Sequence, residues 1–219
     1  MLKFPMLWRK GREMRRVFSD IHRTRGWGEG ESVSGPGSTR ERAASFLPEL
    51  VALVGSLEVH TLLDVPCGDF NWAGPLADSV PRYIGVDIVP GLVEANRRRH
   101  AAPSRRFLCR DLVTQRLPQA DLVLCRDALV HLRLEDIVAA LDNLGRTGAT
   151  YLLATTFVEE RPNEDIDTGG WRPLNLQRPP FGFPAPLALI DERCHHTGGV
   201  YADKRLGLWR FSDLPRRAR

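Results

Sequence analysis

Short apolar runs bounded by polar residues recur through the chain and predict five buried strands. Each run is too short for a helix and is rich in Val, Leu, Ile, Tyr or Phe, which is typical of strands inside a sheet. The predicted strands cover residues 61–65, 82–87, 105–111, 120–127 and 149–157.

Segments with apolar residues at helical spacing separate these runs. They predict helices over residues 38–54, 72–80, 91–101 and 134–148. Ser38 or Thr39 caps the first of them, and Pro48 predicts a kink or a restart within it. Two further runs, 186–194 and 205–211, predict an antiparallel hairpin. Because parallel strands need crossover connections, the whole pattern predicts an α/β fold with one doubly wound, seven-stranded, mostly parallel sheet.

Two segments fall outside this alternation. Residues 1–37 predict a basic N-terminal arm that ends in the loop GWGEGESVSGPGS, which is too rich in Gly and Ser for a regular element. Residues 158–186 contain six prolines and no helical period. A loop of that length is uncommon in a compact domain unless it is functional. We therefore expect one domain over residues 38–219, with 158–186 as its substrate or lid loop.

Composition limits the class of protein. The chain has 219 residues, 42% apolar residues and a mean hydropathy of −0.26, which describes a globular chain rather than a disordered one. No apolar run approaches the roughly 18 residues that cross a bilayer, and the apolar stretch at the N-terminus is too short for a signal peptide. The four cysteines are widely spaced and form no CxxC pair, which favours free thiols. We expect a cytoplasmic protein without a membrane partner.

Positive charge is concentrated at the start of the chain. The net charge is +4, and residues 1–26 contain eight Lys and Arg against Glu13 and Asp20. Such a segment is either a solvated arm or a docking surface for RNA or an acidic membrane. The absence of a nucleic-acid module signature favours the solvated arm.

The turn after the first predicted strand, in TLLDVPCGDFNW, is the first candidate for ligand chemistry. Ligands of doubly wound sheets bind at the carboxyl ends of the strands. A dinucleotide site needs glycines there, so that the backbone can approach a pyrophosphate. In this chain Pro66 and Phe70 occupy two of the three glycine positions, and Asp69 adds a negative charge. No P-loop sequence follows, so a phosphate-bearing cofactor is disfavoured.

S-adenosylmethionine matches this turn better. It has no phosphate, and the ammonium of its amino acid part attracts carboxylates. Gly68 permits close approach of the backbone, and Asp87 ends the second predicted strand, where its two oxygens can accept both ribose hydroxyls. Asp111 ends the third predicted strand, within reach of the adenine amino group. An acid at the end of each of three successive strands favours this cofactor far more strongly than a single acid would.

On these residues the chain resembles the class I S-adenosylmethionine-dependent methyltransferases, of the small bacterial tailoring type. The resemblance covers residues 38–157 and the C-terminal hairpin, and it implies a Rossmann-like fold. It places Asp64 and Gly68 in motif I, although DVPCGDF replaces the usual DxGxGxG pattern. The full set of cofactor-binding residues that we expect is Trp27, Ser38, Asp64, Gly68, Asn71, Trp72, Asp87, Ile88, Asp111, Leu112 and Arg126.

The sequence CRDALVHL after the fourth predicted strand holds the candidate catalytic residues. Asp127 and His131 are spaced i and i+4 and share a face if the chain is helical there. In the resembled fold this segment borders the methyl-transfer centre, where a histidine is suited to accept a proton from a hydroxyl. Alternatively, His131 packs under the sheet or hydrogen-bonds the cofactor. Arg126 either stacks on the adenine or pairs with Asp127.

Two loops are expected to cover the strand ends. Trp27 belongs to a predicted lid, and Ser38 with the following helix N-terminus is expected to hold the methionine carboxylate. Both loops have a purely structural alternative. The second loop offers polar and aromatic side chains for a sugar or hydroxylated natural product, and we expect Asp165, Trp171, Arg172 and Asn175 to bind it. The sequence CHHTGG resembles a metal site only superficially, and we expect no metal.

We therefore expect an enzyme that moves a methyl group from S-adenosylmethionine to an oxygen or nitrogen of a small polar acceptor. One alternative is an RNA methyltransferase that docks nucleic acid through its basic N-terminal arm. Another is a cofactor-binding module without catalytic activity. The sequence leaves the acceptor, the methylated atom and the oligomeric state open.

Overall fold

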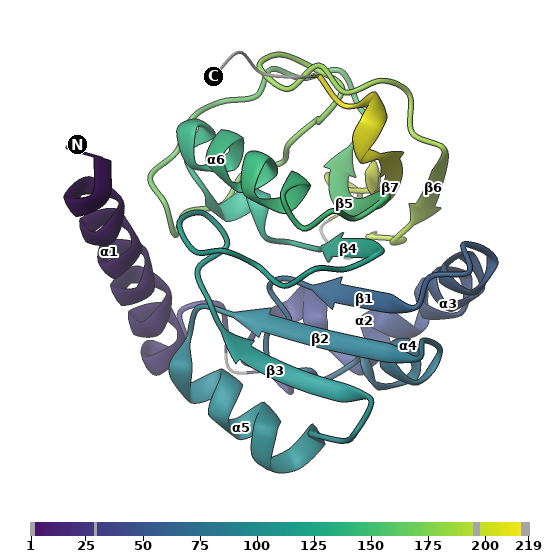
Figure 1. Ribbon diagram of the computed structural model, residues 1–219. Helices are drawn as coiled ribbons and strands as arrows, with labels where there is room; N and C mark the ends of the chain where they lie inside the picture. Colours follow the sequence, from purple (N-terminus) through teal and green to yellow (C-terminus); the bar gives the residue numbers. More distant parts are fainter. Residues whose placement is uncertain (1–2, 29, 195–197, 216–219) are drawn as a thin grey trace.

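The computed structural model describes residues 3–28, 30–194 and 198–215. In these residues one seven-stranded sheet runs in the order β3-β2-β1-β4-β5-β7-β6 (Figure 1). The strands are β1 (Thr61–Asp64), β2 (Arg82–Asp87), β3 (Arg105–Cys109), β4 (Leu122–Cys125), β5 (Tyr151–Phe157), β6 (Ala188–Asp191) and β7 (Lys204–Arg210).

The sheet is parallel from β3 to β5 and antiparallel at its other edge, where β7 pairs with β5 and β6 pairs with β7. This confirms the predicted doubly wound, mostly parallel sheet with an antiparallel C-terminal hairpin. The order reverses between β1 and β4, so the carboxyl ends of these two strands form the switch point at which such sheets bind ligands.

Side chains alternate between the two faces of the sheet and form two cores. Along β1, Leu62 packs with the core under α2 (Arg40–Ala44), α3 (Leu47–Ser56), α4 (Gly74–Asp78) and α5 (Pro90–His100). Its neighbour Leu63 packs with the opposite core, under α6 (Leu134–Gly145). Both leucines are fully buried, which explains why the strand reads as a continuous apolar run.

The helix predicted over residues 38–54 consists of two helices, α2 and α3. Thr39 caps α2, because its hydroxyl accepts a hydrogen bond from the Arg42 amide at 3.3 Å. Pro48 lies in the first turn of α3, where its missing N–H costs no hydrogen bond. The expected restart at Pro48 is therefore correct.

The N-terminal segment differs from the expected arm and loop. Residues 3–24 form one long helix, α1 (Lys3–Thr24), which lies beside the carboxyl ends of the strands between α5 and α6 (Figure 1). Met14, Val17, Phe18 and Ile21 have the i, i+3, i+4, i+7 spacing of an apolar helix face. The basic residues around this stripe drew the sequence interpretation toward a solvated arm, but the stripe packs on the domain, with Met14 buried and the other three residues partly buried.

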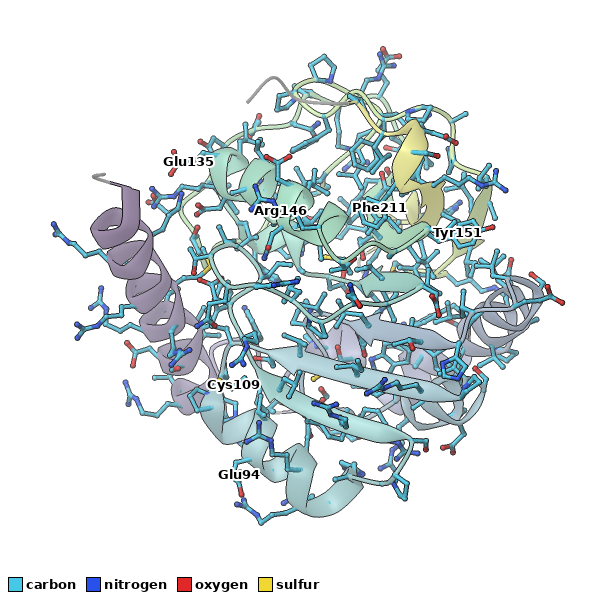
Figure 2. The ribbon with its side chains drawn as sticks, viewed as in Figure 1. Glu94, Cys109, Glu135, Arg146, Tyr151 and Phe211 are labelled. Carbon is cyan, nitrogen blue, oxygen red and sulfur yellow. The ribbon has the colours of Figure 1, made fainter. Side chains whose placement is uncertain are left out.

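Close backbone contacts secure α1. A Cβ on Gly11 of this helix would lie 2.8 Å from the Thr114 hydroxyl oxygen, and one on Gly169 would lie 2.6 Å from Val17 Cγ1. Lys10 also forms an ion pair with Glu135 at 3.1 Å, and Figure 2 shows Glu135 projecting from α6 toward α1. Within the described residues, no helix combines the length and apolar character needed to cross a membrane.

Candidate active site

An open cavity lies at the carboxyl ends of the central strands, beneath α1. Twelve of the residues expected in the cofactor and catalytic sites line it, namely Trp27, Ser38, Asp64, Gly68, Trp72, Asp87, Ile88, Asp111, Leu112, Arg126, Asp127 and His131.

Asn71 is the exception among the expected cofactor-binding residues. It is not part of the cavity wall. Its amide nitrogen donates to Glu31 Oε1 at 2.7 Å and to the Ser38 carbonyl at 3.1 Å. Asn71 therefore ties the N-terminal loop to the turn after β1, and its expected contact with the cofactor is not supported by its position.

Gly68 cannot be replaced without strain. Its φ is +54°, which L-residues rarely adopt, and an added Cβ would lie 2.3 Å from the Ser34 hydroxyl oxygen. The Gly68 amide donates to Asp87 Oδ2 at 3.1 Å. The turn thus presents bare backbone to the cavity and joins the ends of β1 and β2, which suits a ligand that needs close approach.

The two acids at the ends of β1 and β2 are buried and carry raised pKa values. Burial raises the pKa of Asp64 to about 7, although the Tyr83 hydroxyl donates to it at 2.5 Å. Burial also raises the pKa of Asp87 to about 6, opposed by hydrogen bonds from the Val89 and Gly68 amides. Each Asp87 oxygen accepts one of these amides and retains capacity for a further donor such as a ribose hydroxyl.

The raised pKa of Asp87 predicts that cofactor affinity depends on pH. Ribose hydroxyls donate to the ionised carboxylate, so below pH 6 a bound proton must leave Asp87 before the ligand binds. The dissociation constant of S-adenosylhomocysteine should rise by about tenfold between pH 8 and pH 5. Calorimetry in matched buffers measures it.

Asp87→Asn is the control for this dependence. It should bind S-adenosylhomocysteine about 30- to 150-fold more weakly at pH 8, because a charge-assisted contact worth about 2–3 kcal/mol is lost. It should also vary less with pH than the wild-type protein. An equal pH response in both proteins would assign the titration to another group, with Asp64 as the first candidate.

Asp69 and Phe70 take positions that the sequence interpretation did not foresee. The Asp69 carboxylate accepts hydrogen bonds from the Ser32 hydroxyl and the Val33 amide, both at 2.9 Å, and so fastens the N-terminal loop. Phe70 is buried behind the sheet, with its ring centroid 5.3 Å from that of Tyr83. Of the three residues expected to repel a pyrophosphate, only Pro66 borders the cavity.

Asp111 lies in the cavity wall with both carboxylate oxygens engaged. Oδ1 accepts from the Val113 amide at 2.8 Å, and Oδ2 accepts from the Thr114 hydroxyl at 2.5 Å. These bonds hold the turn after β3 beneath α1. The proposed contact with the adenine amino group stays a prediction, since it requires a third acceptor direction on this carboxylate.

Arg126 belongs to a cluster of four charged side chains, in which Asp127 is partly exposed and the other three are buried. It pairs with Glu192 at 2.5 Å and with Asp127 at 3.3 Å. Lys204 completes the cluster, 2.7 Å from Asp127 and 3.1 Å from Glu192. The guanidinium carbon also lies 4.7 Å from the centroid of the Phe46 ring. Of the two roles considered for Arg126, the structure shows the ion pair with Asp127.

Sequence reasoning did not find Glu192 and Lys204. Glu192 follows β6 and Lys204 begins β7, so both approach β4 only through the antiparallel edge of the sheet. Each is a charged residue that is at least nine-tenths buried, and this burial is visible only in the structure. Such residues need partners, but their sequence does not reveal which partners the fold brings.

His131 is held in one tautomer. It ends a short 3-10 turn over Leu129–His131 rather than an α-helix, and its Nδ1 lies 2.7 Å from the Gly170 carbonyl oxygen. Because a carbonyl only accepts, Nδ1 carries the proton and Nε2 keeps a free lone pair. Burial lowers the pKa of His131, so the ring is neutral near pH 7.

Asp127 has a different character from His131. Its φ is +51°, and its amide donates to the Thr155 hydroxyl at 2.8 Å. Burial alone works to raise the pKa of Asp127, but the ion pairs with Lys204 and Arg126 outweigh it and hold the pKa well below its usual range. Asp127 is therefore a permanent anion beside the cavity, and its lowered pKa makes it a poor proton acceptor for the expected catalytic pair.

The four residues expected to bind substrate do not line the cavity. Asp165 accepts the Leu134 amide at 2.7 Å at the start of α6, and Asn175 donates to the Glu159 carbonyl at 3.1 Å. Trp171 is 42% exposed and lies against Tyr201, with ring centroids 4.7 Å apart.

Arg172 joins the loop over residues 158–186 to the turn that carries His131. Its guanidinium donates to the carbonyls of Val130 at 2.8 Å and Leu132 at 2.6 Å, on either side of His131. Backbone carbonyls in an irregular buried segment need such partners. The polar side chains of residues 158–186 thus satisfy the backbone, and the loop serves the site by orienting His131. His195 and His196 of CHHTGG lie outside the described residues.

Comparison with known proteins assigns the family. A family model described as a methyltransferase domain matches residues 62–148. Uncharacterized methyltransferases of Mycobacterium tuberculosis strain H37Rv and of Mycobacterium bovis are 37% identical over 153 residues, which covers 64% of this chain and 77% of each relative. This chain belongs to the class I S-adenosylmethionine-dependent methyltransferases.

Two solved structures show the same fold as this methyltransferase. Magnesium protoporphyrin IX methyltransferase from Synechocystis PCC 6803, solved with bound S-adenosylmethionine, has a TM-score of 0.51 and 18% identity over 70% of this chain and 79% of its own. The cyclase SpnF has a TM-score of 0.50 and 22% identity, over 64% of this chain and 56% of its own. The predicted family, enzyme class and cofactor are confirmed.

The residues at the strand ends fit this cofactor. Gly68 borders the cavity without a side chain, and each oxygen of the Asp87 carboxylate accepts only one backbone amide. When bound, S-adenosylmethionine supplies a methyl group already activated by its sulfonium. The chain's own task is then to align an acceptor, exclude water and take up a proton.

Proposed function

We propose that this methyltransferase methylates an oxygen or nitrogen of a small molecule, with His131 as the proton acceptor. The observation that carries the proposal is the hydrogen bond from His131 Nδ1 to the Gly170 carbonyl at 2.7 Å. It leaves Nε2 of a cavity-lining histidine free to accept a proton. The Asp127 carboxylate favours the charged form of His131, so it stabilises the imidazolium formed during the reaction.

The position of α1 over the cavity favours a small acceptor. Met14 and Phe18 of α1 and Trp27 after it line the cavity, so the acceptor enters a space that α1 partly covers. Excluding water strengthens the electrostatic interactions inside such a site. The loop residues that suggested a sugar lie outside the cavity wall, so the proposal keeps a small molecule but no longer rests on a polar binding loop.

The RNA alternative has less support from the position of α1. Arg9, Arg16 and Arg23 are exposed on this helix, but the helix lies on the domain and covers the cavity. A nucleotide base would have to pass the lid to reach His131. Steep loss of RNA affinity with rising salt would favour the alternative. Cofactor binding without methylation of any acceptor would favour a non-catalytic module.

Cofactor selectivity tests the basis of this proposal. S-adenosylhomocysteine should stabilise the protein, whereas NAD and ATP should not, since the cavity offers carboxylates rather than a phosphate-binding turn. At one hundred times its dissociation constant a ligand adds about 2.7 kcal/mol, which shifts the unfolding midpoint by roughly 5–10 °C in a chain of this size. Thermal unfolding with each ligand measures the shift. A shift with NAD and none with S-adenosylhomocysteine would contradict the assignment of the turn.

A further inference from the structure

We propose that the acceptor is an uncharged, flat aromatic molecule with an acidic hydroxyl, a phenol, bound beneath α1 and beside Trp27 and His131. The inference rests on the proposed function and names its substrate class. The part of the cavity near Asp64, Asp87 and Asp111 belongs to the cofactor. The remaining wall, around His131, is where the acceptor must lie.

The wall around His131 is apolar and aromatic. The Trp27 ring centroid lies 4.9 Å from that of His131 and 6.1 Å from that of Phe18. Met14 and Leu132 are 95% or more buried and also border the cavity. If the acceptor carried many hydroxyls, those hydroxyls would lose their hydrogen bonds to water without gaining partners on this surface, which would weaken binding. An aromatic ring has no such groups and stacks favourably.

The charges beside this wall are already paired. Arg126 and Asp127 line the cavity, and their partners Glu192 and Lys204 complete two cations and two carboxylates. A charged acceptor would lose its hydration here, and the cluster has no unpaired opposite charge to replace it. The described wall next to His131 therefore favours an uncharged acceptor.

The base itself favours an acidic hydroxyl. A neutral imidazole takes a proton far more readily from a phenol, with a pKa near that of tyrosine at about 10, than from an aliphatic alcohol. The phenol oxygen forms a bond to the methyl carbon as the carbon–sulfur bond breaks, and the bonding pair stays on sulfur in S-adenosylhomocysteine. The phenolic proton moves to His131 Nε2, and the imidazolium later releases it to water.

A matched set of acceptors tests the inference on the full-length protein with S-adenosylmethionine. The set is 2-naphthol, its saturated counterpart decahydro-2-naphthol, 2-naphthylamine and methyl glucoside, with methylated products measured by mass spectrometry. The value of kcat/KM for 2-naphthol should exceed that for each other acceptor by about 100-fold or more. Faster methylation of the saturated alcohol, the amine or the glucoside would overturn the inference but leave the proposed function standing.

Variants place the acceptor. Trp27→Ala should raise the KM for 2-naphthol by about tenfold with a smaller change in kcat, since it removes a stacking wall. Trp27→Phe should restore most of the affinity. Trp171→Ala is the matched control, because Trp171 lies outside the cavity wall, and its KM should equal that of the wild-type protein.

Binding gives a second measurement that does not depend on turnover. Saturation-transfer NMR with the S-adenosylhomocysteine complex should detect 2-naphthol with the wild-type protein and lose most of the signal with Trp27→Ala. Retained thermal stabilisation by S-adenosylhomocysteine shows that the variant is folded. If 2-naphthol is neither bound nor methylated at millimolar concentration, the inference is wrong. If 2-naphthol is methylated equally well by His131→Gln, the acceptor class stands and the proposed proton acceptor is wrong.

Discussion

Replacing His131 with glutamine is expected to lower kcat for methylation of a hydroxyl by about 100- to 10,000-fold, the usual contribution of a general base. The glutamine amide can still donate to the Gly170 carbonyl, as Nδ1 does at 2.7 Å, so the 129–132 turn should keep its conformation. The amide cannot accept a proton as Nε2 does. Steady-state kinetics with a hydroxyl acceptor measures the loss.

Cofactor affinity is the internal control for this variant. His131 borders the cavity, but Asp64, Gly68 and Asp87 are expected to hold the cofactor, so the dissociation constant of S-adenosylhomocysteine should change little. The pH profile separates chemistry from packing. Wild-type kcat should rise with pH as His131 loses its proton at a pKa below its usual range, and His131→Gln should lack that step. A variant with kcat within tenfold of the wild-type value would place the proton acceptor elsewhere.

Replacing Lys204 with methionine is expected to reduce the free energy of unfolding by about 3–5 kcal/mol, because it removes one cation from a buried ion cluster. Lys204 is only 7% exposed, and its ammonium contacts both Asp127 and Glu192. Methionine nearly matches the side chain in size, so the loss reports charge rather than volume. The unfolding midpoint should fall by roughly 6–20 °C for a chain of this length.

Two further variants test the physical reason. Lys204→Met combined with Glu192→Gln removes one charge of each sign and should recover part of the lost stability, since Arg126 and Asp127 remain paired. Arg98→Met breaks an exposed ion pair with Glu94 and should change stability by less than about 1 kcal/mol. Equal losses for Lys204→Met and Arg98→Met would contradict the view that burial makes the cluster costly to break.

The sequence alone determined the sheet and most of the residues that line the cavity. Strand and helix periods are local properties, and the carboxyl end of each parallel strand lies at the same edge of the sheet. Asp64, Asp87 and Asp111 could therefore be placed together without knowledge of any long-range contact. Gly68 was identifiable for the same reason, since the turn that needs it follows directly after β1.

The same local reading was wrong wherever a side chain's direction depended on the turn. Phe70 has a φ of +56° and follows Gly68 at +54°, so its ring points behind the sheet instead of toward the ligand. Asp69 faces the N-terminal loop and fastens it through Ser32 and Val33. The expected cofactor was correct, but charge and bulk at these two positions are not the physical reason for it.

Only the tertiary structure decided how the part of the cavity around Asp127 and His131 is built. Lys204 lies 77 residues from its partner Asp127, and Gly170 lies 39 residues from the His131 ring that it orients. The apolar stripe of α1 was visible in the sequence, but its position over the cavity was not. The sequence of a helix does not show which surface its apolar face will pack against. The sheet decides which distant elements meet, and this decides which charges pair and which surface an amphipathic helix covers. Local periodicity contains no information about these long-range contacts.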